Sequence, residues 1–153
     1  MPSADNGLHG RILVVDDFEP WRRQICSILQ SAQFCVVAEA ADGLEALQKV
    51  RELKPDVILL DIALPKLNGL ETAKRICEID HSAKIIFVSQ NDDADVVRAA
   101  LRIGAEGYVS KKDVSRDLLR AVEGALRGEH FASSGVTRLE PINRKPLKKI
   151  PSL

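Results

Sequence analysis

Short apolar runs alternate with amphipathic segments along most of the chain. Five runs predict strands, and most of them are continuous and rich in β-branched residues: 11–15, 34–40, 57–60, 84–88 and 107–110. Each run precedes a segment with apolar residues at helical spacing, and these segments cover about 20–32, 43–53, 69–79, 91–103 and 114–127. The pattern predicts five strands and five helices in strict alternation.

This alternation restricts the architecture. Parallel strands need crossover connections, the crossovers are right-handed, and the helices then cover both faces of the sheet. We therefore predict a doubly wound α/β fold for residues 11–128, a three-layer sandwich around a five-stranded parallel sheet.

The two ends of the chain depart from this pattern. Residues 1–10 are polar, and we expect them to be flexible. Residues 129–153 contain three prolines and, from Arg138 on, five basic residues against one acid, which is typical of a linker or tail. Such a tail could contact nucleic acid or a partner, but a solvated linker is the simpler interpretation. No helical pattern follows residue 128, so we expect no output domain in this chain.

Composition excludes several classes of function. The 153 residues suggest a single domain, and 22 basic residues balance 22 acidic ones, which leaves no overall charge to attract nucleic acid or membranes. The N-terminus lacks a signal-peptide pattern, and no apolar run reaches the roughly 20 residues that span a bilayer. Three cysteines without a CxxC spacing fit a reducing compartment. We therefore expect a cytoplasmic protein without membrane contact.

Reactive side chains stand directly after four of the five predicted strands. Asp16 and Asp17 follow the first strand, Asp61 the third, Ser89 the fourth and Lys111 the fifth. Ligands of open parallel sheets bind beyond the carboxyl ends of the strands, so these residues should meet at one edge. Each residue alone has a plainer interpretation, as a helix cap, a turn residue or a solvated lysine. Together they would require four coincidences, which favours a site.

The chemistry of this set points to metal-assisted phosphoryl transfer. Three carboxylates at one edge repel one another and raise each other's pKa unless a cation lies among them. Oxygen ligands suit Mg²⁺, whereas Zn²⁺ would need His or Cys, which these strand ends lack. The Lys111 amine and the Ser89 hydroxyl are donors for an anion, most simply a phosphoryl group. Asp61, alone on the central strand, can then act as the nucleophile.

With these residues the chain resembles the receiver domains of bacterial two-component response regulators, over about residues 11–128. The matching motifs are Ile12-Leu13-Val14-Val15-Asp16-Asp17, Asp61 with Pro65 and Gly69, Ser89, and Gly104-Ala105-Glu106-Gly107-Tyr108-Val109-Ser110-Lys111. The last motif and the final helix, which ends in Arg127-Gly128-Glu129, are most similar to the NarL/FixJ subgroup. The resemblance implies a flavodoxin-like receiver fold with strand order 2-1-3-4-5.

The resemblance also implies a phosphoacceptor and a metal site. Asp61 would accept a phosphoryl group from a phosphohistidine on a sensor histidine kinase or a phosphotransfer protein. Asp16, Asp17, Asp61 and the backbone carbonyl of Ala63 would bind Mg²⁺. The protein would thus be a signalling module that catalyses only its own phosphorylation and dephosphorylation.

The remaining implied roles concern switching. Lys111 would pair with the phosphoryl oxygens, and Ser89 would hydrogen-bond one of them. Tyr108 would rotate inward as Ser89 moves, which would alter the surface formed by the fourth helix, the fifth strand and the fifth helix. The added charge of roughly −1.5 to −2 would bias an existing equilibrium between two states. Receivers often dimerise, so a homodimer is a further expectation.

The chain departs from the family in places, and two other functions stay open. Lys112 stands where many receivers have a cis proline, so we expect a trans bond after Lys111. Gln90 follows Ser89, where many receivers have Ala, which allows a degenerate receiver that acts only by protein contact. A Mg²⁺-dependent phosphatase or phosphotransferase would carry a second acid where Ala63 stands. NarL/FixJ regulators usually continue into a helix-turn-helix domain, but no such pattern is present, so DNA binding is not predicted for this chain.

Overall fold

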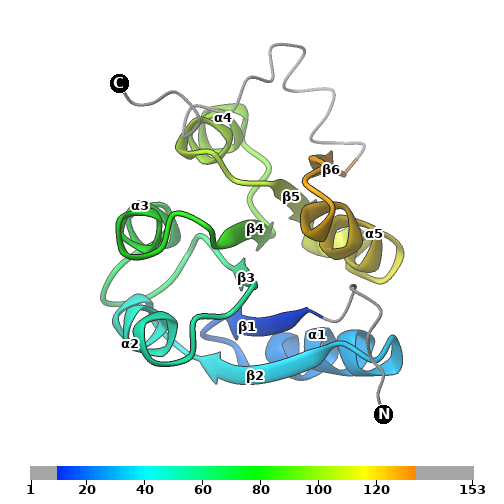
Figure 1. The fold of residues 1–153 in the computed structure, drawn as a ribbon. Helices are drawn as coiled ribbons and strands as arrows, with labels where there is room; N and C mark the ends of the chain where they lie inside the picture. The colour runs from blue at the N-terminus through cyan, green and yellow to red at the C-terminus, as the bar shows by residue number, and fades with distance from the viewer. Residues whose placement is uncertain (1–9, 134–153) are drawn as a thin grey trace.

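The computed structural model describes residues 10–133 and shows the predicted alternation of strands and helices (Figure 1). The strands are β1 (Arg11–Val15), β2 (Cys35–Ala40), β3 (Val57–Leu60), β4 (Lys84–Ser89), β5 (Gly107–Ser110) and β6 (Phe131–Ala132). The helices are α1 (Glu19–Ser31), α2 (Gly43–Leu53), α3 (Gly69–Ile79), α4 (Ala94–Ile103), α5 (Val114–Leu126) and the short 3₁₀ helix η1 (Lys111–Asp113).

The strands form one parallel sheet in the order β2-β1-β3-β4-β5-β6. The predicted order 2-1-3-4-5 and the flavodoxin-like receiver fold are confirmed, with one difference. A sixth strand of two residues, which the apolar pattern did not predict, pairs with β5. It lies within the segment 129–153 that we expected to be a linker. The rest of that segment, 134–153, and most of the predicted flexible N-terminus, 1–9, lie outside the described residues.

The two faces of the sheet carry separate cores because successive strand residues point to opposite faces. On one face Leu13 and Ile58 pack with α2, α3 and α4, and on the other Ile12 and Leu59 pack with α1 and α5. Figure 1 shows these two layers of helices on either side of the sheet. The sheet is therefore buried on both faces, which fixes the strand register and, with it, the positions of the residues at the strand ends.

Polar caps start three of the helices that cover the first face. The side chains of Asp42, Asn68 and Asp93 accept hydrogen bonds from backbone N–H groups in the first turns of α2, α3 and α4. None of the peptide bonds described is cis, so the bond between Lys111 and Lys112 is trans, as predicted.

Candidate functional site

Residues from three strands meet at the carboxyl edge of the sheet. Asp16 follows β1, Asp61 follows β3 and Lys111 follows β5, and their exposed fractions are only 1%, 6% and 4%. Asp17, beside Asp16, is exposed. One oxygen from each of the three acids lies within 4.8 Å of the others. The structure thus brings together the acids and the lysine that the strand ends suggested.

Lys111 bridges the two buried carboxylates. Its Nζ lies 2.6 Å from Asp16 Oδ2 and 3.1 Å from Asp61 Oδ2. The other oxygen of each carboxylate is fixed by the backbone, because Asp16 Oδ1 accepts from the Phe18 N–H (2.9 Å) and Asp61 Oδ1 accepts from the Ile62 N–H (2.8 Å). The sequence suggested that Lys111 faces the acids, but not that its shortest contact is with Asp16.

One carboxylate oxygen of this cluster, Asp16 Oδ2, accepts no hydrogen bond from the described residues. The contact of Lys111 with Asp16 Oδ2 is an ion pair without hydrogen-bond alignment, so this buried oxygen has no hydrogen-bond partner among the described residues. The ammonium compensates its charge, and a carboxylate oxygen with a single partner can still accept a further ligand. With two further carboxylates nearby, the oxygen set fits a hard divalent cation such as Mg²⁺.

Burial dominates the electrostatics of Asp61. It raises the pKa of this carboxyl above its ordinary value, Lys111 opposes the change, and the negative charge of Asp16 adds to it. Three carboxylates face one ammonium here, so the fully ionised cluster carries a net charge of −2 (three negative charges and one positive). A second positive group at this edge would favour the ionised form of Asp61.

Helix α1 supplies two contacts to the cluster that sequence reasoning missed. The ring of Trp21 lies over Lys111, with 4.9 Å between Nζ and the ring centroid. Arg22 donates from Nη1 to the Asp16 carbonyl oxygen (2.8 Å) and pairs through Nε with Glu39 (3.0 Å). Trp21 is also a partly buried apolar residue of α1 that packs against the core on this side of the sheet. The only signal of its second role was its place in the first turn after the two adjacent acids.

Ser89 and Tyr108 form a separate group beside the acids. Ser89 Oγ accepts a hydrogen bond from the Asn91 N–H (3.0 Å), and the Tyr108 hydroxyl donates to the carbonyl of the same residue. The Tyr108 ring is fully buried and packs at a tilt on Phe87, with centroids 6.2 Å apart. Burial raises the pKa of Tyr108 to about 12. The ring therefore lies in the inward position in this structure.

The loop after β3 is fixed by a close backbone approach. Gly69 donates its N–H to the Ile62 carbonyl (2.7 Å), and a Cβ on Gly69 would overlap the carbonyl oxygen of Asp61. Only glycine fits here without displacing the backbone that carries Asp61. Ala63, whose carbonyl was expected to complete the metal site, is exposed in the same loop.

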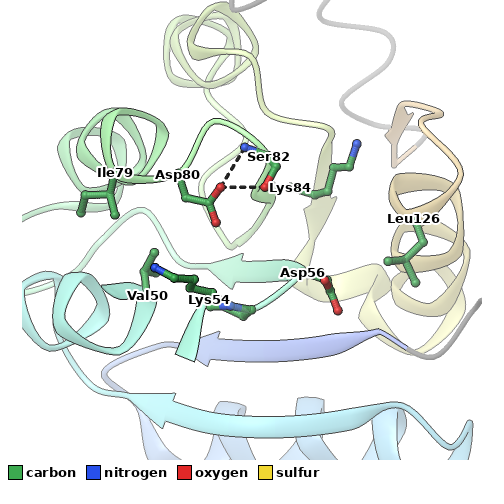
Figure 2. Close-up of a pocket in the computed structure, with 9 residues that line it drawn as sticks. Val50, Lys54, Asp56, Ile79, Asp80, Ser82, Lys84 and Leu126 are labelled. Carbon is green, nitrogen blue, oxygen red and sulfur yellow. Dashed lines mark hydrogen bonds between the residues drawn. The ribbon is translucent and has the colours of Figure 1, made fainter. Parts of the chain in front are cut away.

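A second hollow lies at the opposite edge of the sheet, where the strands begin (Figure 2). It has a volume of about 590 Å³, and Lys54, Asp56, Asp80 and Lys84 contribute its charges. Asp80 already accepts hydrogen bonds from the backbone N–H and the hydroxyl of Ser82 (2.9 and 2.7 Å). None of the acids, lysine or serine at the carboxyl edge lines this hollow, so it is separate from the candidate site.

The fold and the arrangement at its carboxyl edge define a receiver module of two-component signalling. The chain belongs to the response regulator receiver domain family, whose sequence profile matches residues 12–123. It is 38% identical to the chemotaxis protein CheY of Listeria monocytogenes over 117 residues, which cover 76% of this chain and 98% of that protein. The match to the nitrate/nitrite response regulator NarL of Escherichia coli is 35% identical and covers 82% of this chain and 59% of that protein.

Solved structures support the same assignment. A two-component response regulator of the LuxR family from Aurantimonas sp. superposes with a TM-score of 0.81 at 32% identity, covering 84% of this chain and 93% of that one. The longest helices of residues 10–133 are too short or too polar to cross a membrane.

Proposed function

We propose that Asp61 is the phosphoacceptor of this receiver. A carboxylate oxygen of Asp61 attacks the phosphorus of a phosphohistidine, the phosphorus–nitrogen bond breaks, and the imidazole leaves as the aspartyl phosphate forms. The observation that carries the proposal is the shared contact of Lys111 with Asp16 and Asp61, which assembles a nucleophile, a second acid and a cation in one buried place.

The proposal includes a metal site, in which the three acids are neighbours in the structure and the Ala63 carbonyl is the ligand that the family resemblance implies. Asp16, Asp17, Asp61 and the Ala63 carbonyl would hold Mg²⁺, which when bound neutralises negative charge on the carboxylates and the phosphoryl oxygens. The buried Oδ2 of Asp16, which has only the lysine for a partner, supports this assignment. Arg22 holds the Asp16 carbonyl and so keeps the two adjacent acids in place.

Lys111 and Ser89 are the groups that sense the phosphoryl group. The Lys111 ammonium already lies beside Asp61 and pairs with the new phosphoryl oxygens after leaving Asp16. Ser89 donates its hydroxyl to a phosphoryl oxygen and so moves relative to Asn91, which in this structure is hydrogen-bonded to both Ser89 and Tyr108. Tyr108 then changes its contacts with the loop before α4, and the surface of α4, β5 and α5 changes with it.

The physiological donor is a sensor histidine kinase or a phosphotransfer protein, and the module works in the cytoplasm. It turns over no separate substrate, because the product of transfer is its own modified Asp61. The degenerate alternative is less well supported, since the acids, the lysine and the serine are all present and the first four lie together. A homodimer remains part of the proposal, whereas DNA binding by this chain is not.

Intact-mass measurement tests the proposal. The protein incubated with Mg²⁺ and acetyl phosphate should gain one phosphoryl group, and Asp61→Asn should abolish the gain. Asp95→Asn is the matched control, because the Asp95 side chain is 89% exposed on α4. Phosphorylation of the Asp61→Asn variant would move the site elsewhere. An unmodified wild type without beryllofluoride-induced amide shifts would favour the degenerate receiver.

A further inference from the structure

The segment after α5 is tied to the free edge of β5. The Phe131 N–H donates to the Glu106 carbonyl (3.1 Å), and the Ser133 N–H donates to the Tyr108 carbonyl (3.0 Å). A third bond continues this ladder with a side chain, because the Ser110 N–H donates to Ser133 Oγ (3.1 Å). The segment 131–133 thus binds every second residue from Glu106 to Ser110, along the edge of β5.

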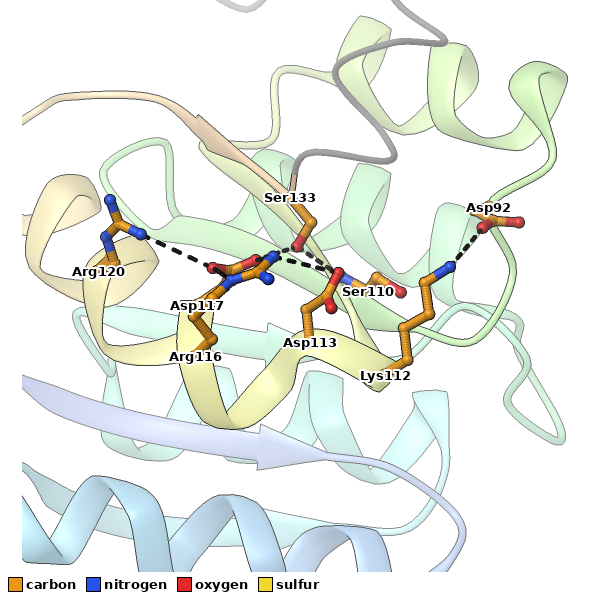
Figure 3. Close-up of polar contacts among 8 residues, drawn as sticks. All are labelled: Asp92, Ser110, Lys112, Asp113, Arg116, Asp117, Arg120 and Ser133. Carbon is orange, nitrogen blue, oxygen red and sulfur yellow. Dashed lines mark hydrogen bonds and ion pairs between the residues drawn. The ribbon is translucent and has the colours of Figure 1, made fainter.

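A buried carboxylate supports the third bond (Figure 3). Ser133 Oγ donates to Asp117 Oδ2 (2.8 Å), and the exposed fractions of Ser133 and Asp117 are 0% and 2%. Arg116 donates to both oxygens of Asp117 (2.9 and 3.1 Å), and Arg120 lies 4.0 Å away. The hydrogen bond from Arg116 lowers the pKa of Asp117, so this carboxylate is ionised and is a strong acceptor for the serine hydroxyl.

This buried group is connected to the reaction site by the backbone. Ser110 is the last residue of β5 and directly precedes Lys111, and on its other side it is paired in register with Ser89 of β4. The bond from Ser110 to Ser133 therefore fixes the stretch of backbone from which the Lys111 side chain reaches Asp16 and Asp61. Residues that hold a functional side chain in place in this way support its geometry without contacting the substrate.

We propose that Ser133 and Asp117 are positioning residues for Lys111. They hold Ser110 at the edge of the sheet, and the position of the Lys111 ammonium depends on them. The proposal rests on the proposed phosphoacceptor function. Coupling between two sites is reciprocal, so phosphorylation of Asp61, which draws Lys111 away from Asp16, changes the strength of the Ser110–Ser133 bond in return.

Variants of the full chain test this role. Ser133→Ala removes the hydroxyl, Asp117→Asn removes the charge that orients it, and Ser115→Ala is the control because Ser115 is an exposed serine of α5. Ser133→Ala should slow phosphoryl gain from acetyl phosphate about fivefold, because the Ser110 N–H next to Lys111 loses its partner and one neutral hydrogen bond of about 1 kcal/mol corresponds to roughly this factor. Asp117→Asn should also slow phosphoryl gain. Because asparagine has nearly the same shape as aspartate, this variant tests the proposal even if Ser133→Ala folds poorly. Ser115→Ala should not change the rate.

A second readout does not depend on phosphorylation. Trp21 is the only tryptophan in the chain and lies beside Lys111, so its emission reports the position of the ammonium. In the otherwise wild-type protein, Ser133→Ala should change the Trp21 emission. In a protein that already carries Lys111→Met, Ser133→Ala should leave the emission unchanged, because its effect passes through Lys111. A purely structural role would change the emission equally in both backgrounds.

The outcomes separate the two proposals. If the wild type gains no phosphoryl group, the proposed function fails, and the emission cycle alone decides the positioning role. If the wild type is phosphorylated but Ser133→Ala behaves as Ser115→Ala in rate and emission, the positioning role is refuted and the phosphoacceptor stands. Equal emission changes with and without Lys111→Met would also refute it.

Discussion

Replacement of Lys111 by methionine removes the ammonium that both buried carboxylates share. At an effective dielectric constant of about 20, charges separated by the observed 2.6 and 3.1 Å attract by roughly 6 and 5 kcal/mol. Much of this is offset in the native protein by the cost of burying the lysine. The net loss on breaking a buried pair is about 3–5 kcal/mol, a large share of the roughly 5–15 kcal/mol that stabilises a domain.

The loss should depend on pH. In the native protein Lys111 holds down the pKa of Asp61 against burial and Asp16, so its removal raises that pKa further above the unfolded value of 3.8. A raised native pKa contributes stability that is fully present below the unfolded pKa and is lost as pH rises through the native pKa. The deficit of Lys111→Met is therefore greatest at neutral pH and shrinks as the pH falls toward 3.8.

Urea unfolding followed by circular dichroism measures this deficit at about pH 7.5 and about pH 5. Lys112→Met is the matched control, because the Lys112 side chain is 70% exposed and its Nζ lies 4.0 Å from Asp92 Oδ2. An exposed pair of this kind is worth less than about 1 kcal/mol. A deficit for Lys111→Met that equals the control, or that is constant with pH, would refute the reasoning.

Three further predictions concern the surroundings of the site. Gly69→Ala forces the backbone at Asp61 to shift, so the free energy of unfolding, measured by thermal unfolding, should fall by about 1–3 kcal/mol. Intact-mass measurement should show a slower phosphoryl gain, and a variant with unchanged stability and rate would contradict the close approach of the two backbone segments. Tyr108 is the only tyrosine, and its tyrosinate absorbance should appear with a midpoint of about 12, whereas a midpoint of 10.0 would show an exposed hydroxyl. Trp21 emission should change when Mg²⁺ and beryllofluoride are added, and constant emission would show that Lys111 does not move.

The sequence was sufficient for the parts of the molecule that depend on strand ends. In a parallel sheet all carboxyl ends lie at one edge, so apolar runs that stop at Asp16, Asp61 and Lys111 place these residues together without knowledge of any contact. The same apolar runs set the strand register and predict the two layers of helices, whereas the strand order 2-1-3-4-5 was predicted from the family resemblance. The roles of Ser89 and Tyr108 in switching stay predictions.

The remaining contacts could not be read from local patterns because they depend on tertiary packing. Asp117 lies among the polar positions of α5, and a carboxylate there is expected in solvent, yet Ser133 and the arginine before it make burial favourable. Residues 131–132 are too short for any periodicity, and their pairing depends on the vacant edge of β5. Trp21 and Lys111 are far apart in the sequence, so neither predicts the other.

The sixth strand also affects how the domain behaves in solution. Without it, the carbonyls of Glu106 and Tyr108 and the N–H of Ser110 would form a row of unpaired groups along β5. Such a row is a template for pairing with a strand of another molecule. A protein trimmed at the end of α5, the boundary suggested by its apolar pattern, would keep the whole phosphoacceptor cluster and yet be prone to self-association. The two residues of β6 thus help to keep the sheet from growing between molecules.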